Sequence, residues 1–236
     1  MSIAENVATI KENIRRAALA AGRDPSEIQL CAATKMNDAD AVRQAIAAGV
    51  DCCGENRVQE LTAKQAENAY EGAPVHFIGR LQTNKVRQVV GKVDLIQSVD
   101  RLKLLEAVNA EAARQGIIQD ILLQINIGKE DTKGGFFPEE LPALLPSLAN
   151  FPSIRVVGLM AIPPICQDAT KNDKFFQEMC RIGVDINSKK YDNVWVNVMS
   201  MGMSDDYESA IRCGSTMIRV GTAIFGARDY TKPHQP

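Results

Sequence analysis

The stretch Ile28–Asn56, IQLCAATKMNDADAVRQAIAAGVDCCGEN, contains the repeating unit that decides the fold. Ile28–Thr34 is a short apolar run typical of a buried strand, and Asp51–Gly54 is a second short run. Between them, the Ala-rich segment Ala39–Ala48 has helical periodicity and begins beside the capping candidates Asp38 and Asp40. A strand, a helix and a strand in immediate succession predict two parallel strands joined by a crossover helix.

The same alternation continues along the whole chain. The predicted strands are Ile28–Thr34, Asp51–Gly54, Val75–Ile78, Leu95–Ser98, Ile121–Ile127, Arg155–Ala161, Val194–Ser200 and Thr216–Val220. The predicted helices are Ala4–Ala21, Ala39–Ala48, Asn56–Tyr70, Thr83–Val90, Arg101–Gln115, Glu139–Leu148, Asn172–Lys189 and Ser204–Cys213. Roughly eight strand–helix repeats favour a single (β/α)8 barrel of the TIM type, with one extra helix at the N-terminus. No GxGxxG motif follows the first strand, which argues against a Rossmann fold.

Length and charge set the class of protein. The 236 residues suit one barrel domain spanning 1–236, with a frayed polar tail at 232–236. Lys and Arg number 27 and Asp and Glu 29, giving a formal net charge of −2 and no basic footprint for nucleic acid or an anionic membrane. The N-terminal segment carries charges where a signal peptide needs an apolar core, so we expect a cytoplasmic protein. We also expect a monomer.

The cysteines do not form a recognisable metal motif. There are six, at positions 31, 52, 53, 166, 180 and 213, with neither a CxxC pair nor a zinc-ligand spacing. His76 and His234 are the two histidines available to join them. The sequence therefore predicts reduced thiols packed as small hydrophobic groups, and no metal site.

Polar residues follow most of the predicted strands, at the end where barrel proteins place their working residues. These residues are Lys35, Glu55, Asn56, Arg80, Asn126, Ser200, Ser204, Arg219, Gly221 and Thr222. Because the carboxyl ends of parallel strands meet at one rim, we expect these groups to gather there.

Lys35 and the last two strand ends together indicate a chemistry. A partly desolvated lysine at a barrel mouth can attack an aldehyde to form a Schiff base, although a lysine after a strand is more often a solvated charge. Gly202 and Gly221 can bring backbone N–H groups close to a phosphate, with Ser204 and Thr222 adding hydroxyl donors. Ordinary turn glycines with capping hydroxyls are the alternative. An aldehyde-seeking lysine beside a phosphate cradle suggests a phosphorylated aldehyde cofactor.

Several longer motifs carry a resemblance to a known family. They are Thr34-Lys35, Gly54-Glu55-Asn56, His76–Lys85 (HFIGRLQTNK), Gly158-Leu159-Met160, Ser200–Asp206 (SMGMSDD) and Gly214–Gly226 (GSTMIRVGTAIFG). Across nearly its whole length the sequence resembles the pyridoxal phosphate homeostasis proteins, the YggS/PROSC family. That family is similar to the barrel domain of alanine racemase, the fold-type III class of pyridoxal phosphate proteins.

The resemblance implies pyridoxal 5'-phosphate (PLP) as cofactor and assigns residues to it. Lys35 would form the Schiff base and Asn56 would lie near the ring. Ser200 or Ser204, with Gly221 and Thr222, would hold the phosphate. Arg219 would face the pyridine nitrogen.

Three positions depart from the family pattern. Met36 follows the lysine where many members have Thr, Arg57 replaces a frequent Tyr, and Val75 replaces a frequent Trp. None of the three removes an implied cofactor ligand, but Arg57 changes the charge expected at the edge of the pocket.

Three functions are compatible with these residues. An arginine facing the ring nitrogen makes the cofactor a weaker electron sink. The second domain of alanine racemase, which supplies a tyrosine base, has no counterpart here, and Tyr70, Tyr191, Tyr207 and Tyr230 offer no obvious replacement. The first hypothesis is therefore a PLP-binding protein that buffers the cofactor or delivers it to apo-enzymes. The others are an amino-acid racemase and a colourless Schiff-base aldolase without cofactor.

Two further segments keep two interpretations each. The segment His76–Lys85 is either a structural turn with a solvated basic helix start, or an exposed face that meets a partner or a substrate amine. Its two positive charges at a helix N-terminus hint at an anionic neighbour. The loop Asn126–Gly135 is either a surface loop or a lid with glycine hinges.

Overall fold

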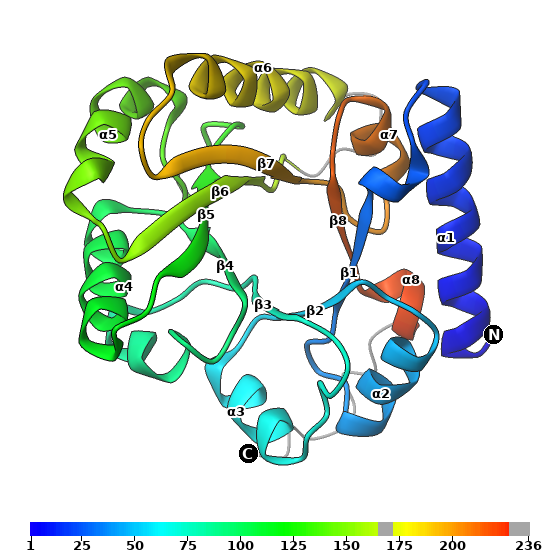
Figure 1. The fold of residues 1–236 in the computed structure, drawn as a ribbon. Helices are drawn as coiled ribbons and strands as arrows, with labels where there is room; N and C mark the ends of the chain where they lie inside the picture. The colour runs from blue at the N-terminus through cyan, green and yellow to red at the C-terminus, as the bar shows by residue number, and fades with distance from the viewer. Residues whose placement is uncertain (165–171, 227–236) are drawn as a thin grey trace.

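Eight parallel strands close into a barrel in the computed structural model, which describes residues 1–164 and 172–226 (Figure 1). The strands are β1 (Gln29–Ala33), β2 (Cys52–Glu55), β3 (Val75–Phe77), β4 (Leu95–Val99), β5 (Gln119–Ile125), β6 (Ile154–Ala161), β7 (Val194–Ser200) and β8 (Met217–Val220). They pair in chain order, and β8 returns to β1 with Cys31 opposite Arg219. The predicted (β/α)8 fold is confirmed. The predicted tail at 232–236 lies outside the described residues.

Helices cover the outside of the barrel, as Figure 1 shows. They are α1 (Ile3–Ala20), α2 (Ala39–Ala47), α3 (Val58–Ala66), α4 (Leu102–Gln115), α5 (Leu141–Ser147), α6 (Asp173–Lys189), α7 (Tyr207–Arg212) and α8 (Thr222–Phe225). Short 3-10 turns are η1 (Pro25–Glu27), η2 (Thr83–Gln88), η3 (Pro138–Glu140) and η4 (Leu148–Asn150). The helix predicted at Thr83–Val90 is thus a 3-10 segment, and α8 was not predicted.

The extra N-terminal helix α1 belongs to the outer layer of helices (Figure 1). Ser2 and Glu5 close a capping box at its start, and Val7, Ile10 and Ile14 form its buried face. Figure 1 places it beside α7 and α8, and it contacts both, as well as α2. The amide of Asn6 donates to the Ile224 carbonyl at 2.8 Å, which ties the start of the chain to α8.

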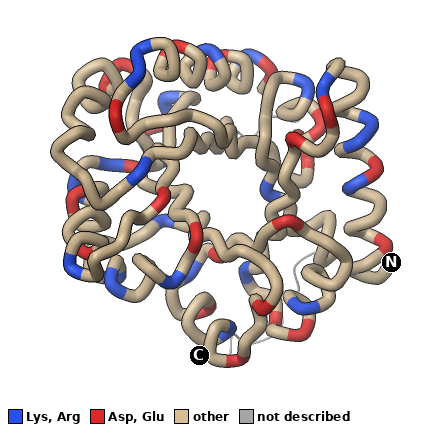
Figure 2. The backbone as a smooth tube through the Cα atoms, in the orientation of Figure 1, with Lys and Arg blue, Asp and Glu red and all other residues tan. Residues whose placement is uncertain are grey.

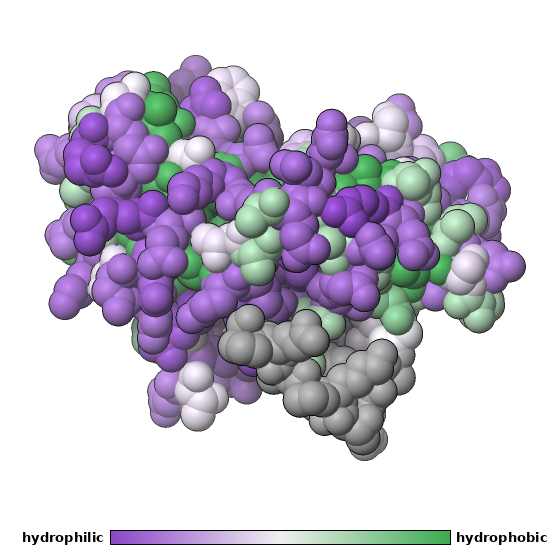
Figure 3. Space-filling model, turned by 90° about the horizontal axis from the view of Figure 1, so that it is seen from below, coloured by the Kyte–Doolittle hydropathy of each residue, from purple (hydrophilic) through white to green (hydrophobic). Residues whose placement is uncertain are grey.

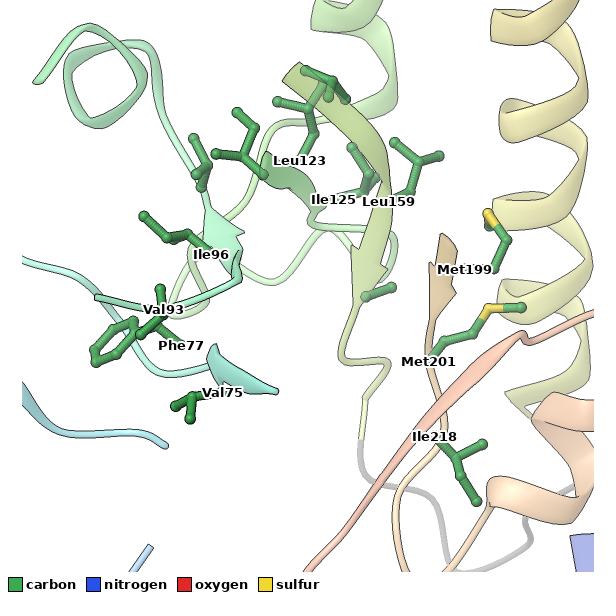
Figure 4. Packing of buried hydrophobic residues seen from close by; sticks show 14 of the residues in the cluster. Val75, Phe77, Val93, Ile96, Leu123, Ile125, Leu159, Met199, Met201 and Ile218 are labelled. Atoms are coloured by element: carbon green, nitrogen blue, oxygen red, sulfur yellow. The ribbon is translucent and has the colours of Figure 1, made fainter. Parts of the chain in front are cut away.

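Alternate residues of each strand point to opposite sides of the barrel wall. The outward side chains pack against the helices in one large core, and Figure 4 shows Leu123, Met199 and Ile218 among them. A smaller cluster fills the barrel interior and consists of Cys31, Cys52, Leu95, Leu122, Met160 and Met217. The two cysteine neighbours in the sequence are therefore separated, because Cys52 faces the interior and Cys53 the helices.

The surface carries mixed charge. Lys, Arg, Asp and Glu are interspersed along the outer helices in Figure 2. The face seen in Figure 3 is mainly hydrophilic, with small scattered apolar areas. Within residues 1–164 and 172–226, no helix is both long and apolar enough to span a bilayer.

Candidate cofactor site

A pocket lies where the first three strands end. It has a volume of about 300 Å³, and the residues that line it are Lys35, Met36, Asn56, Arg57, Gly79 and Arg80. The structure thus brings together residues that the sequence placed at three successive strand ends. A larger hollow of about 430 Å³ lies at the opposite, N-terminal end of β3, between Gln65 and Val75, and contains none of the predicted site residues.

Asn56 is the most informative residue of the pocket. Its side-chain oxygen Oδ1 is buried and has no hydrogen-bond partner among the described residues. A Cβ atom on Gly79 would lie 2.0 Å from the Asn56 carbonyl oxygen, so only glycine allows the two rim segments to meet this closely. Leaving a buried acceptor unsatisfied costs about 1–3 kcal/mol. A bound molecule that donates a hydrogen bond here would remove that cost.

A buried network fixes the backbone on which Lys35 stands. Lys64 donates through Nζ to Glu55 Oε2 at 2.7 Å and to the Thr34 carbonyl at 2.8 Å. Glu55 Oε2 also accepts from Thr34 Oγ1 at 3.0 Å and from the Tyr70 hydroxyl at 3.1 Å. Burial, followed by the charge of Glu55, raises the pKa of Tyr70. The network places Thr34 rigidly, and with it the neighbouring Lys35.

Glu55 is therefore not a rim residue, contrary to its expected place at the end of the second strand. It faces outward because side chains alternate along β2, so Cys52 and Gly54 point inward and Glu55 points to α3.

The turn after Lys35 is held in an unusual backbone conformation. Met36 has a φ of 63°, in the left-handed region that is uncommon for residues other than glycine. Its N–H donates to Glu60 Oε2 at 2.7 Å, which stabilises the turn. Glu60 also faces the Arg57 guanidinium at 3.7 Å. Arg57, which departs from the family pattern, is thus partly neutralised by Glu60.

The turns after β7 and β8 meet each other at the same rim. Ser204 Oγ accepts from the backbone N–H of Ala223 at 3.4 Å, which joins the two turns. Thr222 begins α8, with Gly221 as its N-cap residue. A Cβ atom on Gly221 would lie 3.4 Å from Ala33, so this turn adjoins the end of β1, two residues before Lys35. Ser204, Gly221 and Thr222 therefore gather as the sequence predicts.

Ser200 and Arg219 occupy the barrel interior below this rim. One Arg219 guanidinium nitrogen donates to Ser200 Oγ at 2.5 Å and the other to the Ala161 carbonyl at 2.9 Å. Ser200 Oγ in turn donates to Gln97 Oε1 at 2.6 Å. Desolvation lowers the pKa of Arg219 to about 10, so the guanidinium still keeps its charge at neutral pH. Of the two serines expected to hold a phosphate, Ser204 lies in the turn, whereas Ser200 positions Arg219.

Sequence reasoning missed a second cluster in the interior. Cys31, Cys52 and His76 are all buried, and their ligand-type atoms lie within 4.8 Å of one another. Hydrogen bonding from Cys52, aided by His76, lowers the pKa of Cys31 to about 6, whereas the pKa of Cys52 is raised. The three residues come from three neighbouring strands, so no local spacing reveals them. The signal that could have found them is the alternation of side chains along a strand, because each of the three occupies an inward-facing position on one of three adjacent strands.

The segments left open by the sequence have clear structures. In the loop Asn126–Gly135, the Asn126 amide donates to the carbonyls of Glu130 and Lys133, and Asn126 Oδ1 accepts from the Glu130 N–H at 3.1 Å. In the segment His76–Lys85, His76 is buried, while Arg80 is exposed and lines the pocket. The first loop is therefore closed on itself by Asn126, and the second segment contributes to the pocket wall.

Comparisons with known proteins agree on one family. The family model described as alanine racemase, N-terminal domain, matches residues 6–229. A Pseudomonas aeruginosa protein named pyridoxal phosphate homeostasis protein is 41% identical over 232 residues, covering 98% of each chain. PipY of Synechococcus elongatus, solved with PLP bound, is 34% identical, with a TM-score of 0.82 over 95% of this chain and 100% of that chain. Alanine racemase of Clostridium difficile shares the fold alone, at 16% identity and a TM-score of 0.68, over 95% of this chain and 57% of that chain.

Proposed function

This chain belongs to the alanine racemase N-terminal domain family, and from that premise we propose that it binds PLP covalently through Lys35 and acts in PLP homeostasis. The observation that carries the proposal is the pocket at Lys35, in which the buried Asn56 Oδ1 lacks a protein donor among the described residues. The relatives support it, because the Pseudomonas aeruginosa protein is named for PLP homeostasis and PipY was solved with PLP bound.

The residues present fit this cofactor. Lys35 would hold its aldehyde carbon and Asn56 would contact the ring. Ser204, Gly221 and Thr222 would hold the phosphate, where a joined pair of turns adjoins the end of β1. When bound, PLP supplies a reactive carbonyl and a conjugated ring that can accept electrons.

Arg219 determines how strongly that ring could draw electrons. A guanidinium has only donors, so facing the pyridine nitrogen it would leave that nitrogen without a proton. Ser200 and the Ala161 carbonyl hold Arg219 in place from within the barrel. This arrangement favours a binding protein over a strong catalyst of carbanion chemistry.

The tyrosines support the same conclusion. Tyr70 donates to Glu55 on the outer side of the barrel wall, and the Tyr207 hydroxyl accepts from Asn13 on α1. Tyr191 precedes β7, at the opposite end of the barrel. None of these three lines the Lys35 pocket. Tyr230 lies outside the described residues.

The proposal extends to the setting of the protein. The protein acts in the cytoplasm as a monomer, and apo-enzymes that need PLP are its recipients. A single covalent link through Lys35 suits this role because a Schiff base hydrolyses and so releases its aldehyde.

An absorption experiment tests the cofactor. Purified protein is incubated with PLP, and its near-visible spectrum is recorded before and after borohydride reduction, followed by peptide mapping. We expect a reducible adduct on Lys35 that Lys35→Ala abolishes. Lys92→Ala is the matched control, because Lys92 is exposed and precedes β4 at the opposite end of the barrel. A colourless wild type, or an adduct that survives Lys35→Ala, contradicts the proposal.

A turnover experiment tests the role. The PLP-loaded protein is incubated with L-alanine and L-serine, and the products are separated by chirality. We expect turnover far below the ordinary enzymatic range of about 1–1000 per second. Racemisation within that range would instead establish the amino-acid racemase function.

A further inference from the structure

The interior cluster of Cys31, Cys52 and His76 has the composition of a metal site. Cys31 and Cys52 are opposite each other on β1 and β2, and His76 follows on β3. Their exposed fractions are 0%, 2% and 6%. Thiolate and imidazole are the ligands that soft cations prefer. None of the three residues lines the Lys35 pocket or belongs to the turns assigned to the phosphate.

The spacing of the ligand atoms suits a single ion. Cys52 Sγ lies 3.4 Å from His76 Nδ1, and all three ligand atoms fall within 4.8 Å of one another. With metal–sulfur and metal–nitrogen bonds of about 2.3 and 2.0 Å, two ligand atoms of one three-coordinate metal are about 3.7–4.0 Å apart. Small side-chain adjustments are therefore enough to place an ion between them.

A hydrogen-bond chain fixes the tautomer of His76. Arg219 can only donate, so Ser200 Oγ accepts from it and donates its own hydrogen to Gln97 Oε1. The amide nitrogen of Gln97 then donates to His76 Nδ1 at 2.9 Å. Nδ1 is consequently the acceptor nitrogen, and Cys52 Sγ lies 3.4 Å from it. An ion that binds Nδ1 therefore takes the lone pair that now accepts from the Gln97 amide, in the neutral tautomer that this chain fixes.

The charge of Arg219 selects among the soft cations. Arg219 is opposite Cys31 in the β1–β8 pair, and both are buried. Two thiolates with a monovalent cation carry a net charge of −1, which the guanidinium balances. Two thiolates with a divalent cation are neutral and leave the buried guanidinium uncompensated, which is costly in a low-dielectric interior.

We propose that Cys31, Cys52 and His76 form a site for a soft monovalent metal cation, Cu(I), inside the barrel. Binding forms two copper–sulfur bonds and one copper–nitrogen bond and releases the protons of any protonated thiols. No electron transfer is involved. Gly54 packs directly against the cluster, because a Cβ atom there would be 2.8 Å from Cys31 Sγ and 2.8 Å from Ile78 Cδ1.

Competition for Cu(I) tests the site. Cys166, Cys180 and Cys213 are first replaced by Ser, which leaves Cys31, Cys52 and Cys53 as the remaining thiols. The reduced, full-length protein is titrated anaerobically with Cu(I) against bicinchoninate, and Zn(II) is titrated in parallel. We expect one equivalent of Cu(I), bound more tightly than Zn(II). Cys31→Ser and Cys52→Ser should weaken Cu(I) binding by more than the roughly 10–100-fold typical of losing an outer-shell partner.

Cys53→Ser is the matched control, because Cys53 neighbours Cys52 but faces the helices, and it should bind Cu(I) like its parent. X-ray absorption on the parent protein should show two sulfur ligands and one nitrogen ligand, a reading that does not depend on the folding of any variant. Absent binding, binding unchanged in Cys52→Ser, or a preference for Zn(II) would overturn the proposal. Lys35→Ala should bind Cu(I) normally, so failure of the copper site and failure of the PLP site are distinguishable.

Discussion

The buried ion pair between Glu55 and Lys64 is the residue-scale feature on which the candidate site depends. The Glu55 side chain is fully buried and the Lys64 side chain is 7% exposed. Two charges in such a place stabilise the fold only if each satisfies the other and the remaining polar atoms are bonded. Here Thr34 and Tyr70 complete the network, so the pair connects α3 to the strand that carries Lys35.

Glu55→Gln should be strongly destabilising, because it leaves the Lys64 ammonium buried without its counter-charge. We expect a loss of about 3–5 kcal/mol in the free energy of unfolding, measured by denaturant titration. Asp120→Asn is the control, since its partner Arg155 is 60% exposed and the pair should contribute at most about 1 kcal/mol. The double variant Glu55→Gln with Lys64→Met should recover part of the loss. Equal effects of Glu55→Gln and Asp120→Asn would contradict this account.

The location of an individual residue could be predicted from the sequence only where its position along the chain is enough to determine that location. Lys35 and Asn56 follow short apolar strands, so their place at the rim could be read from the order of residues. The outward direction of Glu55 and the interior position of Ser200 depend on which residues of each strand point inward. Glu55 and Asn56, which the sequence placed together at the rim, are separated for this reason. Cys31, Cys52 and His76 meet only because three strands lie side by side.

At the scale of elements, α4 contains a contact whose contribution to stability depends on pH. The direction of that dependence is clear. Hydrogen bonds from Arg114 and then Gln115 lower the pKa of Glu111 from its ordinary 4.5 to about 2. A depressed carboxyl pKa contributes stability above the unfolded-state value, and that contribution disappears as pH falls through the folded value.

Glu111→Gln should therefore reduce the pH dependence of stability between about pH 4.5 and about pH 2. The wild type should exceed the variant in free energy of unfolding near neutral pH, and the gap should narrow as the solution is acidified. Urea titrations at a series of pH values measure this difference in the free energy of unfolding. Glu106→Gln, exposed on the same helix, should leave the slope unchanged. A gap that widens on acidification would contradict the assigned direction of the pKa shift.

Element boundaries were predictable where caps and periodicity coincide, and not elsewhere. Asp38 accepts from the Ala41 N–H at 2.8 Å and begins α2 as expected. The segment Thr83–Gln88 has no side-chain cap and is only six residues long, and it forms 3-10 turns against α4. Helix α8 has four residues, too few for a periodic signal, and tertiary contacts such as that from Asn6 hold it.

At the scale of the whole molecule, closure of the barrel predicts cooperative unfolding. The first helix contacts the last two, through Asn6 with Ile224 and Asn13 with Tyr207. A segment of the barrel therefore cannot unfold without disrupting the segments on either side of it. We propose that residues 1–236 form one domain and expect a single thermal transition whose calorimetric and van't Hoff enthalpies agree. Sedimentation should give a monomer. Two resolved transitions, or a stable dimer, would contradict these expectations.

The strand order could be predicted because each strand–helix–strand unit is local and its handedness is fixed. The details of register could not. Shifts occur between β4 and β5, between β5 and β6 and between β6 and β7, and β7 meets β8 at Ser200 opposite Met217. Such shifts result from the tilt required for closure and from side-chain packing across the interior. The register shifts determine which interior side chains lie at the same height along the barrel axis, and therefore which side chains contact Arg219.

The contact of α1 with α7 and α8 also has a consequence for biosynthesis. Asn6 and its partner Ile224 are 218 residues apart, so α1 leaves the ribosome long before these two neighbours. At roughly 5–20 residues per second, about 10–40 seconds pass before α8 is made. During that time α1 can pack against α2 but lacks its contacts with α7 and α8. The nascent chain therefore leaves part of this amphipathic helix exposed until α7 and α8 have been made, and this is the interval in which a chaperone would bind it.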